Sequence, residues 1–416
     1  MPKSDSTADA PGIRFLDDVT VLEIAALAPD QLGMHLADLG AEVIKIEPPK
    51  RGDAARLIGT QPGFNDSSLH RRWNRGKKSV AVDMTTKEGV DLFLKMVPHV
   101  DIVIEGLRPG SLEKMGVTWD KLVELNPDLV MIAVSGWGQE SPYRTVGSHG
   151  IGFDAVAGLA DIRTDANGEP RVMSNHVNMG TLMAPLFGAS AVLAALNWSR
   201  RTGKPVFLDV SQANAAVFAN LGLEGEAALR SARAAGTIPP APPVDPRGEQ
   251  GIPSGEAMQT YLTRDGKILL LMALELKFFV RLAEVVGHPE LVDLVDKNAY
   301  IVRGSAEIDK ILKQAIATKD LAEWMTIFTK ADVPVVPVYR GAEVLDDIHM
   351  RERLEWVPAP QNTVTLKSPV RATPPTANPA LAPRIGQDTQ EVLSRIGIAP
   401  AEVERLAGAG VIRLEK

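Results

Sequence analysis

The first half of the chain alternates short apolar runs with stretches in which apolar residues recur every three to four positions. The apolar runs predict strands, and the periodic stretches predict amphipathic helices. We expect strands at 19–25, 41–47, 79–84, 101–106 and 129–138, and helices at 29–40, 87–97 and 119–126. Strands that alternate with helices of this length indicate βαβ units and a parallel sheet. The pattern therefore predicts an α/β fold.

A stretch without charged residues, apart from His176, follows at 172–199, and its core from Thr181 to Leu196 predicts a packed helix. The residues at the start of this helix are Asn175, His176, Asn178 and Thr181, so we expect no carboxylate there. Thr181 is a residue type that often caps a helix N-terminus. A strand at 205–211 and one long helix at 212–231 are expected next.

The second half contains two stretches rich in proline and glycine, which are typical of domain boundaries. Between them the pattern predicts a hairpin that turns at Asp265 and Gly266, further helices and a strand at 333–338; two short helices are expected at 388–397 and 400–408. We predict a large Rossmann-like domain whose first part is 1–231, a linker at 232–257, a smaller inserted α+β domain at 258–345, and a return linker with the C-terminal part of the large domain at 346–416.

Composition narrows the function classes. The chain of 416 residues is 45% hydrophobic and carries a formal net charge of −7, which argues against binding to nucleic acid. The absence of cysteine excludes disulfides and thiolate chemistry, and the 7 histidines show no metal-binding spacing. The polar N-terminus predicts a cytoplasmic protein without a signal peptide.

Two motifs are interpreted as structural. Pro185, Gly180 and Gly188 lie within the only membrane-like stretch and favour a buried helix over a membrane span. The segment "GIGFDA" (150–155) matches a dinucleotide fingerprint formally, but it follows a polar loop and not a strand. We therefore expect neither a membrane association nor a permanently bound nucleotide cofactor.

Several stretches in order resemble one family. They are "GAEVIKIEPPKRGD" (40–53), "WNRGKKSVAVDM" (73–84), "DIVIEGLRPGSLEKMG" (101–116), "NPDLVMIAVSGWGQESPY" (126–143), "RTGKPVFLDVS" (201–211), "LTRDGKILLLMALELKFF" (262–279) and "GQDTQEVLSRIGIAPAEVERLAGAGVI" (386–412). Together they are similar to the family III CoA-transferases, the CaiB/BaiF group, which also contains α-methylacyl-CoA racemases. This resemblance implies a Rossmann-like large domain, an inserted smaller domain and two chains interlocked as a dimer.

The resemblance also implies a CoA thioester as substrate. Cationic side chains must then meet the CoA phosphates. The candidates are Arg75, Lys78, Arg108 and Lys114, and the family motif "GLRPG" favours Arg108. The loop after the first strand, with Ala26, Leu27 and Ala28, should also approach the nucleotide, because ligands bind at the carboxyl ends of parallel strands.

Transferases of this family use one aspartate, which forms an anhydride and then an aspartyl-CoA thioester. Counting back from the "LAAL" segment that ends at Leu196 places that position at Thr181, and a three-residue insertion would place it at Asn178. Neither residue is acidic. A hydroxyl cannot replace the carboxylate, because its ester would be comparatively stable and the CoA would leave.

The racemase branch uses a histidine and the same aspartate to exchange an α-proton. The resemblance places the histidine at His149 and its supporting acid at Glu275, whereas the aspartate that usually follows the histidine is Gly150 here. A two-base racemase would lack its second base, although one-base enolisation remains open.

Three interpretations follow. The chain is an active transferase with another nucleophile, or a subunit whose partner carries the aspartate, or a racemase, isomerase or lyase that acts through His149. Relatives of the benzylsuccinate type pair two similar subunits, of which one retains the acid. We favour the subunit interpretation, with an acyl-CoA and a carboxylic acid as substrates. The partner would be a homologous chain that carries the aspartate, or a second copy in an interlocked dimer.

Overall fold

The computed structural model describes residues 12–59, 67–173, 175–239, 258–359 and 363–415. The chain divides into two compact units. The larger contains 3–243 and 354–416, and the smaller contains 244–353.

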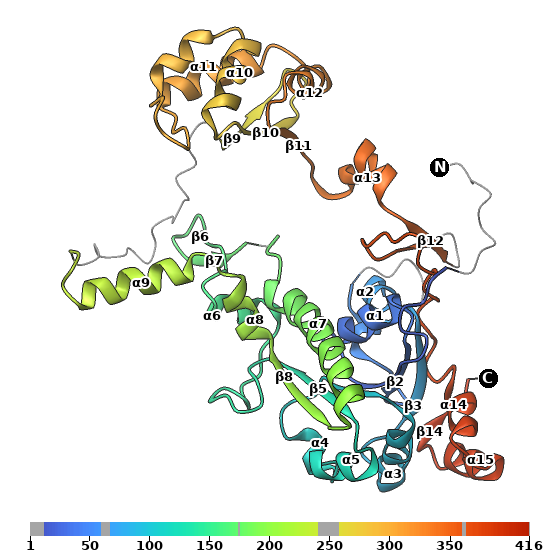
Figure 1. Cartoon of the computed structure of the whole chain (residues 1–416). Coiled ribbons are helices and arrows are strands. Elements are labelled where there is room, and N and C mark those ends of the chain that lie inside the picture. Colours follow the sequence, from blue (N-terminus) through green and yellow to red (C-terminus); the bar gives the residue numbers. More distant parts are fainter. Residues whose placement is uncertain (1–11, 60–66, 174, 240–257, 360–362, 416) are drawn as a thin grey trace. The chain divides into compact units, whose positions relative to one another are not determined.

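The larger unit is built on a seven-stranded sheet in the order β14-β3-β2-β1-β4-β5-β8 (Figure 1). The strands are β1 (Thr20–Ile24), β2 (Glu42–Glu47), β3 (Lys77–Val82), β4 (Ile102–Glu105), β5 (Val130–Ser135), β8 (Val206–Ser211) and β14 (Ile412–Arg413). All neighbours are parallel except β14, which pairs antiparallel with β3. The predicted α/β class with a parallel-dominated sheet is thus confirmed.

Helices connect the strands and cover both faces of the sheet. They are α1 (Asp30–Asp38), α2 (Ser68–Trp73), α3 (Lys87–Met96), α4 (Ser111–Lys114), α5 (Trp119–Leu125), α6 (Gly150–Val156), α7 (Met179–Thr202), α8 (Gln212–Ala219), α9 (Leu223–Ala234), α14 (Thr389–Arg395) and α15 (Pro400–Gly408), with 3-10 turns at Ala54–Leu57 and Val97–His99. Two two-stranded pairs complete the unit: β6 (Ile162–Thr164) with β7 (Pro170–Val172), and β12 (Trp356–Ala359) with β13 (Thr363–Leu366).

The alternation of side chains along β1 divides the core into two layers. Leu22 joins a cluster that includes apolar residues of α3, α5, α14 and α15, whereas Val21 joins one formed with α1 and α7. Successive strand residues point to opposite faces, so a strand that is covered on both sides is buried along its length and consists mostly of apolar residues. All six residues of β5 are buried for this reason.

The smaller unit has a three-stranded antiparallel sheet, β11-β10-β9, covered by helices. Its elements are β9 (Met258–Leu262), β10 (Ile268–Met272), α10 (Leu276–Val285), a 3-10 turn (Pro289–Leu294), α11 (Ala306–Ile316), α12 (Leu321–Lys330), β11 (Val335–Val338), a second 3-10 turn (Gly341–Asp346) and α13 (Ile348–Arg353). The predicted hairpin is confirmed, and Gly266 supplies the left-handed residue of its turn with a φ of +73°. Trp324, Phe279 and Phe328 lie fully buried in the core of this unit.

Two predicted helices differ in the structure. The expected helix at 212–231 is broken into α8 and α9 at Asn220, whose ψ of 84° lies outside the helical range. Helix α9 extends to Ala234, three residues into the stretch that we expected to be a linker; most of that stretch, 240–257, lies outside the described residues. Helix α7 begins at Met179, so Thr181 lies inside its first turn and is not its N-cap.

Within the described part of the chain, α7 is the one helix that is long and apolar enough to cross a membrane. This criterion rests on length and composition alone, and a core helix of a soluble protein also meets it. Ala184, Ala189 and Val192 of α7 are buried against the sheet. Its contacts are therefore those of a packed core helix that leaves part of its apolar surface exposed.

Candidate functional site

A cavity of about 660 Å³ opens where the carboxyl ends of β1, β4 and β5 meet. Parallel strands place their following loops at one edge of the sheet, which explains why distant sequence stretches meet here. Seven of the residues predicted from the sequence line the cavity: Ala26, Leu27, Ala28, Arg108, His149, Asn178 and Thr181. No aspartate or glutamate is among the described residues that line it.

Three predicted residues of the larger unit, Arg75, Lys78 and Lys114, do not line this cavity. Arg75 is buried and pairs with Asp38 at the end of α1. Lys114 is exposed at the end of α4, and Glu275 precedes α10 in the smaller unit. These positions leave Arg108 as the predicted cation that faces the cavity.

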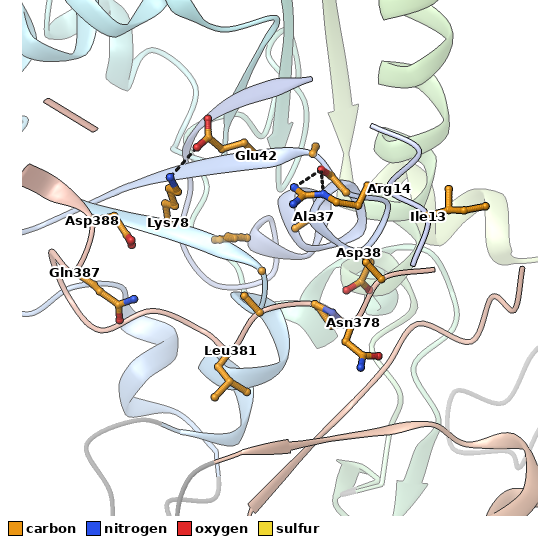
Figure 2. Close-up of a pocket in the computed structure, with 17 residues that line it drawn as sticks. Ile13, Arg14, Ala37, Asp38, Glu42, Lys78, Asn378, Leu381, Gln387 and Asp388 are labelled. Carbon is orange, nitrogen blue, oxygen red and sulfur yellow. Dashed lines mark hydrogen bonds and ion pairs between the residues drawn. The ribbon is translucent and has the colours of Figure 1, made fainter. Parts of the chain in front are cut away.

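Lys78 lies in a different pocket, of about 440 Å³, at the amino ends of β2 and β3 (Figure 2). Its Nζ atom is 2.9 Å from Glu42 Oε1 and also pairs with Glu391. The two carboxylates raise the pKa of Lys78 even though partial burial opposes the change. Ligands of parallel sheets bind at the opposite edge, so the fold does not favour a role for Lys78 in the larger cavity.

The loop after β1 is held in a strained conformation. Leu27 has a φ of +62°, a region that residues with a side chain rarely occupy. Its backbone N–H donates to Asp53 Oδ1 at 3.4 Å. Strained residues persist only where their surroundings fix them, and they gather at binding sites. Leu27 lines the cavity, so the strain lies where a ligand would contact the backbone.

A buried network of charged residues holds the loop after β1 in place. Lys45 Nζ lies 2.7 Å from Asp30 Oδ1, 2.7 Å from Asp53 Oδ2 and 3.4 Å from Glu23 Oε1, and it donates to the backbone oxygen of Ala25 at 2.9 Å. All four charged side chains have no exposed surface. Burial opposes the charge of Lys45, but the surrounding carboxylates raise its pKa well above the ordinary value. Lys45 is therefore the cation that Asp30 and Asp53 share.

The network continues to the neighbouring strand. Lys77 Nζ is 2.6 Å from Glu23 Oε1 and 3.0 Å from Asn74 Oδ1. Of the two adjacent lysines of β3, Lys77 is therefore the buried one, and Lys78 remains partly exposed. Burial lowers the pKa of Lys77 and raises that of Asp30 well above the ordinary range. Buried charges require such partners, because an isolated charge would cost several kcal/mol, on the order of 5, to desolvate.

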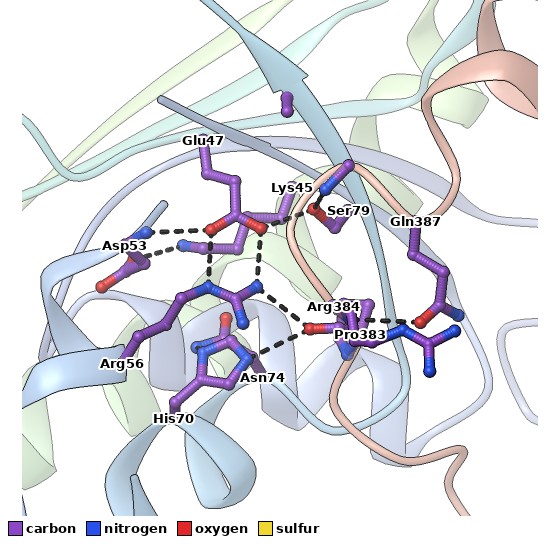
Figure 3. A network of polar contacts seen from close by, with 12 residues as sticks. Lys45, Glu47, Asp53, Arg56, His70, Asn74, Ser79, Pro383, Arg384 and Gln387 are labelled. Carbon is purple, nitrogen blue, oxygen red and sulfur yellow. Dashed lines mark hydrogen bonds and ion pairs between the residues drawn. The ribbon is translucent and has the colours of Figure 1, made fainter. Parts of the chain in front are cut away.

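Glu47 links the network to the C-terminal segment (Figure 3). Its carboxylate accepts two hydrogen bonds from Arg56, at 3.0 and 2.7 Å, and one from the backbone N–H of Asp53 at 2.9 Å. Arg56 also donates to the backbone oxygen of Pro383 at 3.0 Å. The C-terminal stretch around Pro383 is therefore connected through Arg56 to the buried end of β2.

A carboxylate does occupy the start of α7, contrary to our expectation. Asp154 of α6 accepts hydrogen bonds from the backbone N–H groups of Met179 and Gly180, at 2.7 and 2.8 Å, and lies 2.8 Å from His176 Nε2. It is completely buried. The free N–H groups and the dipole of a helix start favour a negative charge there. Asp154 is therefore a capping residue whose two oxygens are already occupied.

Asn178 and Thr181 lie on the first turn of α7 and face the cavity. The Thr181 hydroxyl donates to the backbone oxygen of Asn178 at 2.9 Å, which turns it back onto its own helix. A Cβ atom on Gly150 would lie 2.8 Å from Asn178 Cγ. The glycine beside His149 thus makes room for the Asn178 carboxamide, and the two departures from the racemase pattern are in direct contact.

The lining residues that sequence reasoning missed include Trp73, Arg144 and Gln212. Gln212 directly follows β8, so the rule that ligands bind at carboxyl ends of strands could have identified it. Trp73 and Arg144 had no comparable signal, because their positions depend on how α2 and the loop after β5 fold back over the cavity.

Replacing Gly180 by alanine should displace the start of α7. A Cβ atom there would lie 2.5 Å from the backbone oxygen of Gln212, which cannot move as a flexible side chain could. We expect a loss of about 1–3 kcal/mol in the free energy of unfolding, measured by urea denaturation. Gly225→Ala in α9 is the matched control, because nothing lies within 4 Å of its Cβ position. Equal stability of the two variants would contradict this close packing.

Glu105 should make stability depend on pH. Burial raises the pKa of its carboxyl to about 8, with smaller contributions from Glu113 and Asp209. The unfolded carboxyl ionises near the ordinary value of 4.5. Between these two values the folded state binds more protons, so the free energy of unfolding should fall as pH rises, by about 3 kcal/mol over the range.

Glu105→Gln should remove this contribution to the slope of the unfolding free energy against pH. The measurement is urea denaturation at a series of pH values from about 5 to about 8, the range below the folded pKa of Glu105. The matched control is Glu124→Gln, an exposed position on α5. An unchanged slope in Glu105→Gln would show that Glu105 is ionised in the folded protein.

Comparisons with known proteins agree with the fold. The model of "CoA-transferase family III" matches residues 16–389. Succinyl-CoA--D-citramalate CoA-transferase of Chloroflexus aurantiacus is 33% identical over 345 residues, which covers 82% of each chain. The succinyl-CoA--L-malate CoA-transferase alpha subunit of that organism is 31% identical and covers 95% of this chain and 92% of the relative.

Two further similarities mark the range of the family. Alpha-methylacyl-CoA racemase of Mus musculus is 29% identical and covers 96% of this chain and 98% of the relative. A solved structure of a CAIB/BAIF family protein from Brucella suis is 25% identical, with a TM-score of 0.72 over 91% of this chain and 98% of that one. The chain therefore belongs to CoA-transferase family III.

Proposed function

We propose that this chain is a subunit of a CoA-transferase that moves CoA between carboxylic acids, and that it is the subunit without the nucleophilic aspartate. The observation that carries the proposal is the composition of the cavity: arginine side chains line it, but no carboxylate does among the described residues. A thioester of CoA would be the substrate, and no permanent cofactor is part of the proposal.

A carboxylate is needed for transfer because only an acid forms an anhydride that CoA can reopen and that a second acid can attack. Asp154 is near the right helix, but its oxygens accept two backbone hydrogen bonds and contact His176. It is also completely buried. A buried carboxylate with all its hydrogen bonds made is poorly placed to attack a thioester, so a second chain must supply the nucleophile.

Exposed apolar side chains on α7 and α8 support a partner chain. Leu182 and Leu186 of α7, Phe218 of α8 and Leu221 just after it are 41%, 48%, 72% and 91% exposed. Large apolar side chains exposed on two helices that pack together are a feature of many interaction sites. One similar protein is named an alpha subunit, which implies a second subunit in that enzyme.

The proposal includes the domain borders at 232–257 and 346–416, an interlocked assembly and a cytoplasmic location.

Native mass spectrometry of the purified chain, alone and coexpressed with an aspartate-bearing homologue, tests the partner. We expect a complex that contains both chains. A stable monomer under both conditions would contradict the proposal.

The function is tested with the purified chain, acyl-CoA thioesters and free carboxylic acids in D₂O, with products read by mass spectrometry. We expect no new thioester from the chain alone and transfer after the homologous chain is added. New thioesters from the chain alone would show an active nucleophile within it.

A second function, α-proton exchange through His149, is favoured by one observation. His149 and Asn178 line the same cavity, and Gly150 brings the carboxamide against the histidine loop. An imidazole base with an amide donor for the thioester oxygen would suffice for one-base enolisation. Deuterium at the α-carbon without new thioesters in the same experiment would favour this function, and His149→Gln should abolish the exchange.

A further inference from the structure

We infer that Arg144 forms a pair with Arg108 and that the two guanidinium groups together bind one oxyanion of the substrate. The inference rests on the proposed CoA-thioester function and adds a binding residue that the sequence comparison with the family did not assign. Both arginines line the cavity.

The two side chains come from different loops, and each lies close to the loop that carries the other. Arg108 follows β4, and its Nη2 atom lies 3.1 Å from the position that a Cβ on Gly147 would take. Arg144 follows β5, and its Nη2 atom lies 3.5 Å from the corresponding position on Gly110. Each guanidinium therefore lies against a glycine of the loop that carries the other. These glycines leave the space that lets two cations approach each other.

The loop that carries Arg144 is fixed by its own contacts. The indole nitrogen of Trp137 donates to the backbone oxygen of Val146 at 2.9 Å, and the ring of Tyr143 packs edge-on against that indole. The backbone N–H of Arg144 donates to the Ser141 oxygen at 3.0 Å. The backbone is thus arranged before a ligand arrives, which reduces the entropy lost on binding.

Neither guanidinium has a hydrogen-bond or ion-pair partner within the described part of the chain. By contrast, Arg56 and Arg75 are both paired with carboxylates. Two unpaired cations that share a cavity repel each other until an anion lies between them, and guanidinium forks bind phosphate and carboxylate in a bidentate manner. The shared chemistry is that of an oxyanion, which either a phosphate of CoA or the far carboxylate of a dicarboxylic acyl group could supply.

The test measures binding of full-length protein by titration calorimetry, with Arg144→Met, Arg108→Met and the double variant. The matched control is Arg201→Met, an exposed arginine at the end of α7. We expect Arg144→Met to weaken binding of succinyl-CoA about 10-fold or more, as for the loss of one charge-assisted hydrogen bond. The fold loss of affinity in the double variant should be smaller than the product of the fold losses in the two single variants, because both arginines contact one group. Arg201→Met should bind as the unsubstituted chain does.

Two comparisons distinguish the sources of the anion. If the pair binds a nucleotide phosphate, the effect of Arg144→Met should persist with butyryl-CoA and disappear with S-succinylpantetheine, which lacks the nucleotide. If it binds an acyl carboxylate, the effect should disappear with butyryl-CoA and persist with S-succinylpantetheine. An unchanged affinity of Arg144→Met for all three ligands overturns the inference and leaves the proposed function standing. Failure of the unsubstituted chain to bind any of the ligands overturns both.

Discussion

Replacing Lys45 by methionine should destabilise the larger unit more than any other single substitution considered for its core. The variant would keep the length of the side chain but leave Asp30 and Asp53 without the cation that they surround, whereas Glu23 would keep its contact with Lys77. Removing one partner of a buried ionic group costs about 3–5 kcal/mol, because the remaining charges lie out of reach of water. The free energy of unfolding in urea at neutral pH should fall by that amount.

The loss should be smaller at acidic pH. Without Lys45, the carboxylates can remain buried at lower cost only when they are protonated, so their pKa values should rise in the folded variant. The difference from the unsubstituted chain should therefore shrink as the pH is lowered from about 7 to about 5.

A matched control is Lys87→Met on α3, where an exposed lysine pairs with Asp91. Exposed pairs contribute little to stability, so this variant should unfold as the unsubstituted chain does. Equal losses in the two lysine variants would show that the buried network around Lys45 does not support the fold.

Replacing Asn178 by aspartate should confer acyl trapping and CoA transfer on the chain alone. Asn178 is exposed to the cavity at the N-cap of α7, where the helix dipole favours an anion. The nearby Asp154 carboxylate should keep the pKa of the new acid from falling far, which preserves its nucleophilicity. We expect transfer at about 10²-fold or more above the unsubstituted chain, a modest part of the roughly 10⁶-fold that complete catalytic residues supply.

The comparison with Thr181→Asp distinguishes the two positions that the sequence left open. The Thr181 side chain is turned onto its own helix by its hydrogen bond to the Asn178 oxygen, whereas the Asn178 carboxamide reaches Gly150 beside His149. We therefore expect the larger gain at position 178. Intact-mass detection of an acyl-enzyme, with hydroxylamine release and Asn178→Ala as the control, is the measurement. A larger gain from Thr181→Asp would place the family nucleophile at 181.

The elements of the large sheet could be predicted because their pattern is local. Strands covered on both faces are rich in apolar residues, and β1, β2, β4 and β5 are so even though β1, β2 and β4 also carry buried charged residues. The prediction of a single helix at 212–231 was wrong. Asn220 and Gly222 interrupt the helix, but the apolar pattern of the sequence does not clearly change there. Local propensity at such positions is too weak to predict a break.

The cavity was partly predictable, for a topological reason. Ala26, Leu27, Ala28 and Arg108 directly follow strands, and parallel strands bring such positions to one edge. The predicted Lys78 lies apart from this cavity because neighbouring residues of β3 point to opposite faces. Lys77 enters the buried network, and Lys78 lies in another pocket.

The sequence by itself determined the family, the α/β pattern and the absence of an acid at both candidate nucleophile positions. Only the tertiary structure decided that Asp154 caps α7, that Lys45 lies among three buried carboxylates, and that Arg144 and Arg108 line one cavity. The physical reason is that secondary structure follows from side-chain periodicity along a few residues. The partners of a buried charge or a helix end come instead from distant segments, which meet only when the apolar layers have packed.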